Sequence, residues 1–450
     1  MTAAYYSNSF PWMHYDLLLR VPAQPGLTPG LEPTHRELSF KKGWRYLAFR
    51  TAFGPYANDS MQTALSSGKP PPRIDIGAFY TLPVQYNVLK LAEFEPRWTE
   101  LRFDIDITDY DSVRHCTGKA ICTSCRPLLK TAALVLSRLL NEQFNFRDQL
   151  WCFSGGRGLH CWVVDPAACF LSAEQRAGLS EFFRELANSL RSRTVKDWES
   201  RPLLRRLYQD HLLPDFEAML AGEHLSLRSG PLSQRIRELG AQLRLEGWLG
   251  VSQAQAPLED WAMLRRALGE SVARALVFGV MFPKIDYGVT RGINHMLRAP
   301  FSVREDNGNV VQPLELCEFD TFDFAAPLTV SQNGSPQFRE KLVRAIAVFR
   351  DSLLCREPES QQLCCKLCVE AWLSGRSTEQ SVAYSSRAAV RSHCAGAHKL
   401  STLASSSAIL SVIEMAGQLS RGSGPASLPS YVRRLHYQQV LGALKPESQS

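Results

Sequence analysis

Between Phe103 and Cys125 the chain reads F-D-I-D-I-T-D-Y-D-S-V-R-H-C-T-G-K-A-I-C-T-S-C. Its first part, residues 101–108, alternates apolar and polar residues with the period of two that is typical of a half-buried strand. Asp104 and Asp106 therefore leave the same face, roughly 7 Å apart at a rise of about 3.3 Å per residue. Two such carboxylates can converge on a hard cation, as in sites that clamp phosphates through magnesium or manganese. The alternative is a polar strand face that happens to carry two aspartates.

A glycine-rich turn follows in residues 149–165, which read Q-L-W-C-F-S-G-G-R-G-L-H-C-W-V-V-D. Three glycines surround Arg157 between two apolar runs, and such a turn exposes backbone N–H groups to phosphate oxygens. Arg157 adds a planar, charged donor and His160 a further donor. A glycine-rich turn by itself often forms only a hairpin. Beside a strand with paired aspartates, phosphate binding is the better interpretation.

A third element, residues 283–304, reads P-K-I-D-Y-G-V-T-R-G-I-N-H-M-L-R-A-P-F-S-V-R. It adds one acid, Asp286, and the basic residues Arg291, His295, Arg298 and Arg304. Three carboxylates, two basic clusters and nearby cysteines together predict a nucleotidyl transferase that uses a triphosphate.

This combination resembles the small, catalytic subunit of eukaryotic and archaeal DNA primase, and the wording T-D-Y-D-S-V-R is similar to the eukaryotic branch. The resemblance runs from Y-Y-S-N-S-F-P at residues 5–11 to S-L-P-S-Y-V-R at residues 427–433. It implies an α/β (mixed α+β) primase catalytic fold, with mixed β-sheets flanked by helices. It also implies a DNA-directed RNA polymerase that makes short RNA primers de novo on single-stranded DNA, by two-metal nucleotidyl transfer.

Carried over by position, the resemblance assigns two catalytic Mg²⁺ or Mn²⁺ ions to Asp104, Asp106 and Asp286. It implies a nucleotide motif at Ser154, Gly155, Gly156, Arg157, Gly158, Leu159 and His160, and further nucleotide contacts at His295, Arg298 and Arg304. Animal members have a second arginine at the position of Gly156, and lysine and histidine at those of Arg298 and Arg304. We expect the fixed charge of Arg304 to compensate for Gly156.

Three further matches to the family lie upstream. The motif R-E-L-S-F points to Glu37 as an active-site residue, and two others point to Arg50, Arg73 and Asp75 as nucleotide contacts. By analogy, Asp75 would accept a hydrogen bond from a ribose 2′-hydroxyl. A structural salt bridge is the alternative for each of these residues.

The cysteine loop predicts one structural zinc ion. Cys122-x-x-Cys125 has the spacing of a zinc knuckle, and Cys116 to Cys122 matches the family. Animal members begin this motif with two adjacent cysteines, which align with His115 and Cys116. The predicted ligands are therefore His115, Cys116, Cys122 and Cys125, and the alternative is a loop of buried free thiols. Directly afterwards, Pro127 is expected to open a helix.

A second cysteine group lies late in the chain and remains open. It comprises Cys355, Cys364, Cys365 and Cys368, with His393, Cys394 and His398 beyond. Either two of the later residues complete a second metal site with Cys365-x-x-Cys368, or the thiols are reduced and partly buried. The family pattern offers no such site.

Length and composition agree with a globular nucleic-acid enzyme. The 450 residues are 45% hydrophobic, carry a net charge of +7 and include 12 cysteines. No signal-like N-terminus and no stretch of about 18 apolar residues is present, so no membrane association is expected. We expect a first catalytic half (1–170), an inserted helical subdomain (171–280), a second catalytic half (281–350), and a Ser/Cys-rich segment with a C-terminal helix (351–450).

The implied partners are a large primase subunit, the DNA polymerase alpha complex, single-stranded DNA template, RNA primer and ribonucleoside triphosphates, in the nucleus. Two competing functions stand beside primase. One is a primase-polymerase or repair-type polymerase of the same superfamily, which sugar choice and dependence on a large subunit would distinguish. The other is a non-enzymatic zinc-bearing adaptor, in which Asp104, Asp106 and Asp286 would be replaceable.

Overall fold

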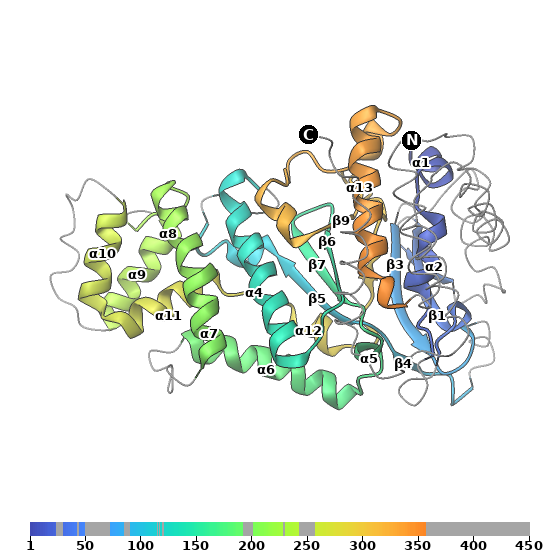
Figure 1. The fold of residues 1–450 in the computed structure, drawn as a ribbon, viewed down its shortest axis with the longest axis horizontal. Helices are drawn as coiled ribbons and strands as arrows, with labels where there is room; N and C mark the ends of the chain where they lie inside the picture. Colours follow the sequence, from blue (N-terminus) through green and yellow to red (C-terminus); the bar gives the residue numbers. More distant parts are fainter. Residues whose placement is uncertain are drawn as a thin grey trace, which may run out of the picture. The chain divides into compact units, whose positions relative to one another are not determined.

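The chain forms two compact units, Met1–Arg356 and Glu357–Ser450. The computed structural model describes residues 1–23, 30–42, 45–49, 73–84, 91–114, 116, 118, 121–191, 201–227, 230–242 and 257–356. All of these lie in the first unit (Figure 1). The second unit, with nearly all of the Ser/Cys-rich segment and the predicted C-terminal helix, lies outside the described residues.

The first unit combines helices with two sheets, which confirms the predicted α/β class. One sheet has the order β2-β1-β3-β4, with β8 also paired to β3. Its strands are β1 (Arg36–Lys42), β2 (Arg45–Phe49), β3 (Arg73–Tyr80), β4 (Pro96–Trp98) and β8 (Leu297–Arg298). The other sheet has the order β5-β7-β6-β9. Its strands are β5 (Leu101–Asp106), β6 (Gln149–Phe153), β7 (Gly158–Val163) and β9 (Gln312–Leu314).

Strand direction differs from the expectation of mixed sheets. Every pairing between the described strands is antiparallel. Short connections explain part of this result, because a tight turn such as the one from β6 to β7 can join only antiparallel neighbours.

Helices cover both faces of the second sheet. The helices of the described residues are α1 (Thr2–Asn8), α2 (Trp12–Leu19), α4 (Arg126–Phe144), α5 (Pro166–Cys169), α6 (Ala173–Arg191), α7 (Pro202–Leu207), α8 (Leu213–Ala221), α9 (Gly230–Gln242), α10 (Pro257–Leu268), α11 (Glu270–Met281), α12 (Tyr287–Arg291) and α13 (Pro336–Ser352), of which α4 and α13 lie on the second sheet. Helix α4 begins one residue before Pro127, and its apolar stripe shares a core with Phe103, Ile105 and Leu159. Helix α13 packs against β6 and β9 in a second core with Leu150 and Cys152.

The described part of residues 171–280 is helical, from α6 to α11 (Figure 1). Within it, α10 ends at Leu268 and α11 begins at Glu270. The break is at Gly269, whose φ of 75° lies in the left-handed region that a helix cannot accommodate. That this segment is an inserted subdomain stays a prediction. Among the described residues, no helix combines the length and apolarity needed to span a bilayer.

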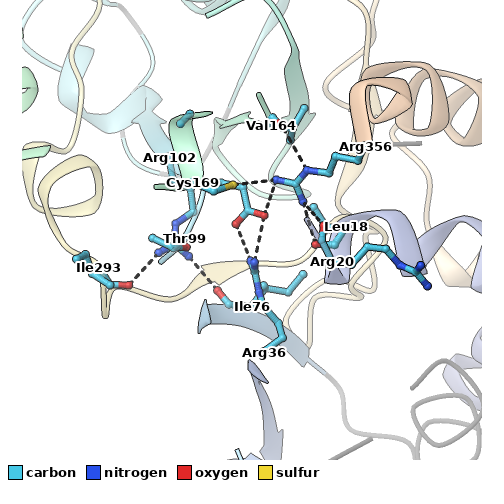
Figure 2. A network of polar contacts seen from close by, with 12 residues as sticks. Leu18, Arg20, Arg36, Ile76, Thr99, Arg102, Val164, Cys169, Ile293 and Arg356 are labelled. Carbon is cyan, nitrogen blue, oxygen red and sulfur yellow. Dashed lines mark hydrogen bonds and ion pairs between the residues drawn. The ribbon is translucent and has the colours of Figure 1, made fainter. Parts of the chain in front are cut away.

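A buried ionic network joins segments from both ends of the first unit (Figure 2). Glu100, just before β5, accepts two hydrogen bonds from Arg36 on β1, at 3.1 and 2.6 Å, and one from Arg356 at 2.9 Å. Arg356 also donates to the carbonyl oxygens of Leu18 and Arg20 at the end of α2. The network therefore anchors the last described residue to the first sheet and to the N-terminal helices.

Two more buried arginines surround the same carboxylate. Arg102 donates to the Ile76 carbonyl on β3 at 3.0 Å, which ties the second sheet to the first. Arg176 on α6 donates to the carbonyl oxygen of Glu100 at 3.1 Å. Among the described residues, Glu100 is the only carboxylate that accepts a hydrogen bond from these four arginines. Burial opposes its ionisation, but the neighbouring guanidinium groups, Arg36 first, hold the pKa of Glu100 well below its usual value.

Candidate active site

The three predicted metal-binding aspartates converge at the end of β5. Asp104 and Asp106 alternate along β5 with Phe103 and Ile105, which are fully buried in the core beneath α4. Asp286 comes from the start of α12, where its Oδ1 accepts hydrogen bonds from the backbone of Gly288 and Val289. Its own backbone N–H donates to the Asp104 carbonyl at 3.0 Å. This bond places the third acid against the strand that carries the first two.

The convergence has an electrostatic cost. Burial, followed by the charges of Asp106, Asp286 and Asp109, raises the pKa of Asp104 to about 7. Burial and Asp106 likewise raise the pKa of Asp109. Carboxylates held together in this way form the donor set that hard divalent cations prefer, so the site fits Mg²⁺ or Mn²⁺.

Asp109 was missed as a member of this cluster by the sequence reasoning. In a continued strand the spacing D-I-D-I-T-D would put Asp109 on the face opposite Asp106, but a 3₁₀ turn (Ile107–Tyr110) carries it back toward the other acids. Its backbone carbonyl accepts a hydrogen bond from Lys284 Nζ at 2.7 Å, two residues before Asp286.

The glycine-rich segment forms the turn between β6 and β7, and Ser154 organises it. The Ser154 Oγ accepts hydrogen bonds from the backbone N–H groups of Gly156 and Gly158, at 3.4 and 3.2 Å. Gly155 has a φ of +73°, and a Cβ at Gly158 would collide with the carbonyl oxygen of Ile105 on β5. The turn therefore needs glycine at both positions, and it lies directly beside the acid strand. Leu159 is buried in the core beneath α4.

Arg157 projects from this turn toward the acid cluster. Its Nε lies 2.6 Å from Asp106 Oδ2, and its side chain is 44% exposed. Thus the predicted phosphate-binding arginine is paired with a predicted metal ligand in this structure. The pair shows that the Arg157 guanidinium, on the glycine turn, reaches the acid cluster.

A basic cluster, made up of His160, Arg298, Arg304 and Arg73, lies beside Asp104. His160 is opposite Asp104 in the β5–β7 ladder, with 3.9 Å between Nε2 and Oδ1. Burial and the charges of Arg298, Arg304 and Arg73 lower the pKa of His160 to about 3, so its ring is neutral at pH 7. Burial, then Arg73 and Arg304, lowers the pKa of Arg298 to about 10. The Arg298 Nε atom is buried without a hydrogen-bond partner in the described part of the chain, so it is available to a ligand.

The first sheet contributes Asp75 and Arg73. Asp75 pairs with Arg298 across β3 and β8 and forms an ion pair with Arg73 at 2.7 Å. This ion pair is the structural alternative foreseen for both residues, and it lies beside the basic cluster. Glu37 is buried on β1 over Gly77, within 3.4 Å of the Tyr80 hydroxyl.

Two other predicted nucleotide contacts are Arg50 and His295. Arg50 lies outside the described residues. His295 is exposed and lines a shallow groove with Glu174, Arg291 and Asn294. A role for Glu37, Arg50 or His295 stays a prediction.

The cysteine loop gathers three of its four predicted zinc ligands. The Sγ atoms of Cys116, Cys122 and Cys125 lie 2.9 to 3.5 Å from one another. Arg114 donates to the sulfur atoms of Cys116 and Cys125, at 3.3 and 3.7 Å, and pairs with Asp111. Three converging sulfur atoms beside a guanidinium fit a zinc thiolate site. His115, the fourth predicted ligand, lies outside the described residues.

The late cysteine group is represented by Cys355 alone. Its thiol is half-buried and donates to the Val164 carbonyl at 3.5 Å, as in ordinary packing against a core. The remaining members, Cys364, Cys365, Cys368, His393, Cys394 and His398, lie outside the described residues.

Comparison with known proteins gives a consistent result. The sequence profile of the family described as DNA primase small subunit matches residues 103–316, which span all three aspartates and the cysteine loop. The DNA primase small subunit of Drosophila melanogaster is 29% identical over 365 residues, covering 74% of this chain and 80% of that protein. That of Schizosaccharomyces pombe is 28% identical, covering 71% and 73%. An archaeal relative, from Halorubrum lacusprofundi, is 26% identical and covers 50% and 61%.

Proposed function

From the premise that this chain belongs to the DNA primase small subunit family, we propose that it is the catalytic subunit of a DNA primase. It synthesises short RNA primers de novo on single-stranded DNA by nucleotidyl transfer, at the start of DNA replication. The observation that carries this proposal is the convergence of Asp104, Asp106 and Asp286 next to the glycine turn and the basic cluster.

Each element of the site has a task in this reaction. Asp104, Asp106 and Asp286 would hold two divalent cations, which lower the pKa of an attacking 3′-hydroxyl and stabilise the pyrophosphate leaving group. Arg298 and Arg304 neutralise triphosphate charge, while His160, neutral at pH 7, donates a hydrogen bond. Arg157 is held by Asp106 in this structure, so it must exchange or share this partner when it binds phosphate.

Sugar selection is assigned to the first sheet. Asp75 is buried and is held by Arg73 beside Arg298. We propose that its carboxylate accepts a hydrogen bond from the ribose 2′-hydroxyl, which favours ribonucleotides over deoxyribonucleotides. Glu37 is further proposed as a catalytic residue and Arg50 and His295 as nucleotide contacts, and their support is the resemblance of the sequence alone.

Assembly and organisation complete the proposal. Cys116, Cys122 and Cys125, with His115, hold one structural zinc ion. The chain works with a large primase subunit and, through it, with the DNA polymerase alpha complex, in the nucleus. The helical segment 171–280 is an insertion between the catalytic halves 1–170 and 281–350, and residues 351–450 form a variable extension.

Primer synthesis tests the proposal directly. Purified protein, with and without a large subunit, is supplied with single-stranded DNA, Mg²⁺ or Mn²⁺ and either ribo- or deoxyribonucleoside triphosphates. We expect short RNA products that depend on Asp104 and Asp106, so that Asp104→Asn and Asp106→Asn abolish synthesis. Asp323→Asn is the matched control, because Asp323 only accepts a backbone hydrogen bond from Ala325. Preferred use of deoxyribonucleotides would instead indicate a primase-polymerase, and full activity of both aspartate variants would indicate a non-enzymatic adaptor.

A further inference from the structure

A small loop, residues 304–309, is built against the glycine turn. The loop is closed by the Arg304 N–H, which donates to the Asn309 carbonyl at 2.8 Å, and by the Gly308 N–H, which donates to the Arg304 carbonyl at 3.0 Å. The bridge between Val303 and Val310 holds its two ends together. The loop is therefore a tight, hydrogen-bonded hairpin.

Two asparagine side chains fix this hairpin to the turn between β6 and β7. The Nδ2 atoms of Asn307 and Asn309 each donate to the Gly155 carbonyl, both at 3.0 Å. Gly155 has a left-handed φ of +73°. Without the two asparagines, only the backbone of the turn itself would hold the Gly155 carbonyl in its orientation. The loop thus determines where the turn and the side chain of Arg304 lie relative to each other.

Arg304 is held by one edge of its guanidinium. Its Nε and Nη2 donate to the two carboxylate oxygens of Asp306, each at 2.9 Å. Its Nη1 makes no hydrogen bond in the described part of the chain, and it lies 2.5 Å from where a Cβ on Gly156 would be. The free donors of Arg304 therefore occupy the space into which a side chain at position 156 would extend.

We propose that Asp306 is a positioning residue for triphosphate binding. It holds Arg304 over the glycine turn with its Nη1 donors free for a phosphate oxygen, and Gly156 is the residue that leaves room for this arrangement. This inference rests on the proposed function. It explains how a chain without a side chain at 156 still presents a guanidinium at that place in the turn.

Asp306 also offsets the repulsion between the arginines of the basic cluster. Arg304 and Arg73 are close enough to Arg298 to lower its pKa, and Asp306 opposes that effect. Without the carboxylate, repulsion from the other two arginines would favour rotation of the flexible Arg304 side chain toward solvent. The bidentate pair with Asp306 prevents that rotation. It uses only two of the five N–H groups of the guanidinium, so the others stay available for a phosphate.

Binding of a triphosphate tests the proposal without requiring catalysis. The probe is a ribonucleoside triphosphate with a methylene bridge between its α and β phosphates, titrated with Mg²⁺ by calorimetry. Asp306→Ala should weaken binding about threefold, within the range of a partly exposed ion pair, and Asp306→Glu should restore most of the loss. In an Arg304→Ala background, Asp306→Ala should have no further effect. The control is Asp351→Ala, which removes the aspartate of an Arg–Asp pair on α13, where this aspartate is 41% exposed against 45% for Asp306.

The role of Gly156 is tested in the same way. Gly156→Ala should weaken binding about tenfold in the wild-type background and less than about twofold with Arg304→Ala, because the added methyl group displaces the guanidinium only when it is there. Gly178→Ala is the control, since a Cβ there meets no atom within 4 Å. Unchanged or tighter binding by Asp306→Ala, or additive effects of Gly156→Ala and Arg304→Ala, would overturn the inference. Failure of the wild-type protein to make primers while it binds triphosphate would overturn the proposed function alone.

Discussion

Replacing Glu100 by glutamine should destabilise the first unit severely. Glu100 has no exposed surface and forms charge-assisted hydrogen bonds to two arginines that are themselves buried, Arg36 and Arg356 (Figure 2). Arg102 and Arg176 add two more buried guanidinium groups within the same region. The nearby thiol of Cys169 does not offset them, because burial raises its pKa to about 11 and keeps it neutral.

The magnitude follows from the uncompensated charge. Glutamine preserves the size of the side chain, but it removes the only carboxylate that these arginines meet among the described residues and turns one acceptor into a donor that faces guanidinium groups. Breaking a buried pair by removing one partner costs about 3–5 kcal/mol. Since the free energy of unfolding of a natural domain is about 5–15 kcal/mol, this single change should remove a large part of it.

The pH dependence has a defined sign. The pKa of Glu100 is lowered on folding from the ordinary 4.5, because the attraction of Arg36 and Arg356 exceeds the opposing effect of burial. The stability that it contributes is therefore fully present above about pH 4.5 and is lost as the pH falls below that value. Glu100→Gln should flatten this acid limb of the stability profile.

Denaturant unfolding, followed by tryptophan fluorescence, measures the effect. The matched control is Glu95→Gln, which breaks an exposed Glu–Arg pair with Arg97 at 3.0 Å and should cost less than about 1 kcal/mol. A Glu100→Gln protein that unfolds within about 1 kcal/mol of the wild type would refute the reasoning. It would mean that the buried arginines are compensated by water or by other groups.

Three further predictions concern the site. The apparent affinity for Mn²⁺, measured by calorimetry, should fall about tenfold from pH 8 to pH 6, because Asp104 with a pKa of about 7 must lose its proton to bind a cation; a flat profile contradicts this. Cys122→Ser should reduce the zinc content from about one per chain and lower the melting temperature, whereas a zinc-free, stable wild-type protein would exclude the site. Arg157→Ala should reduce kcat/KM for triphosphate roughly ten- to a hundredfold with single-stranded DNA binding unchanged by anisotropy, and loss of DNA binding instead would place Arg157 in a nucleic-acid groove.

Local sequence patterns were sufficient for the elements that carry the site. The alternation over residues 101–108 predicted β5 and put Asp104 and Asp106 on one face, because side-chain direction in a strand depends only on its period of two. The glycine-rich turn between β6 and β7 was predicted for a similar reason, since glycine adopts the positive φ of Gly155 without steric cost. The spacing of Cys116, Cys122 and Cys125 likewise predicted their convergence, because the three residues are close together in the chain.

What the tertiary structure decided concerns residues far apart in the chain. No local pattern shows that the backbone of Asp286 bonds to Asp104, that Asp109 turns back to the same cluster, or that Arg304 fills the space above Gly156. Nor does one show that Arg356 and Arg36 share Glu100. These contacts arise only when two sheets and their helices pack together, and their energies depend on burial and on nearby charges. The sequence by itself therefore indicated which groups are proposed to do the chemistry, and packing determined which of them meet and in what state of ionisation.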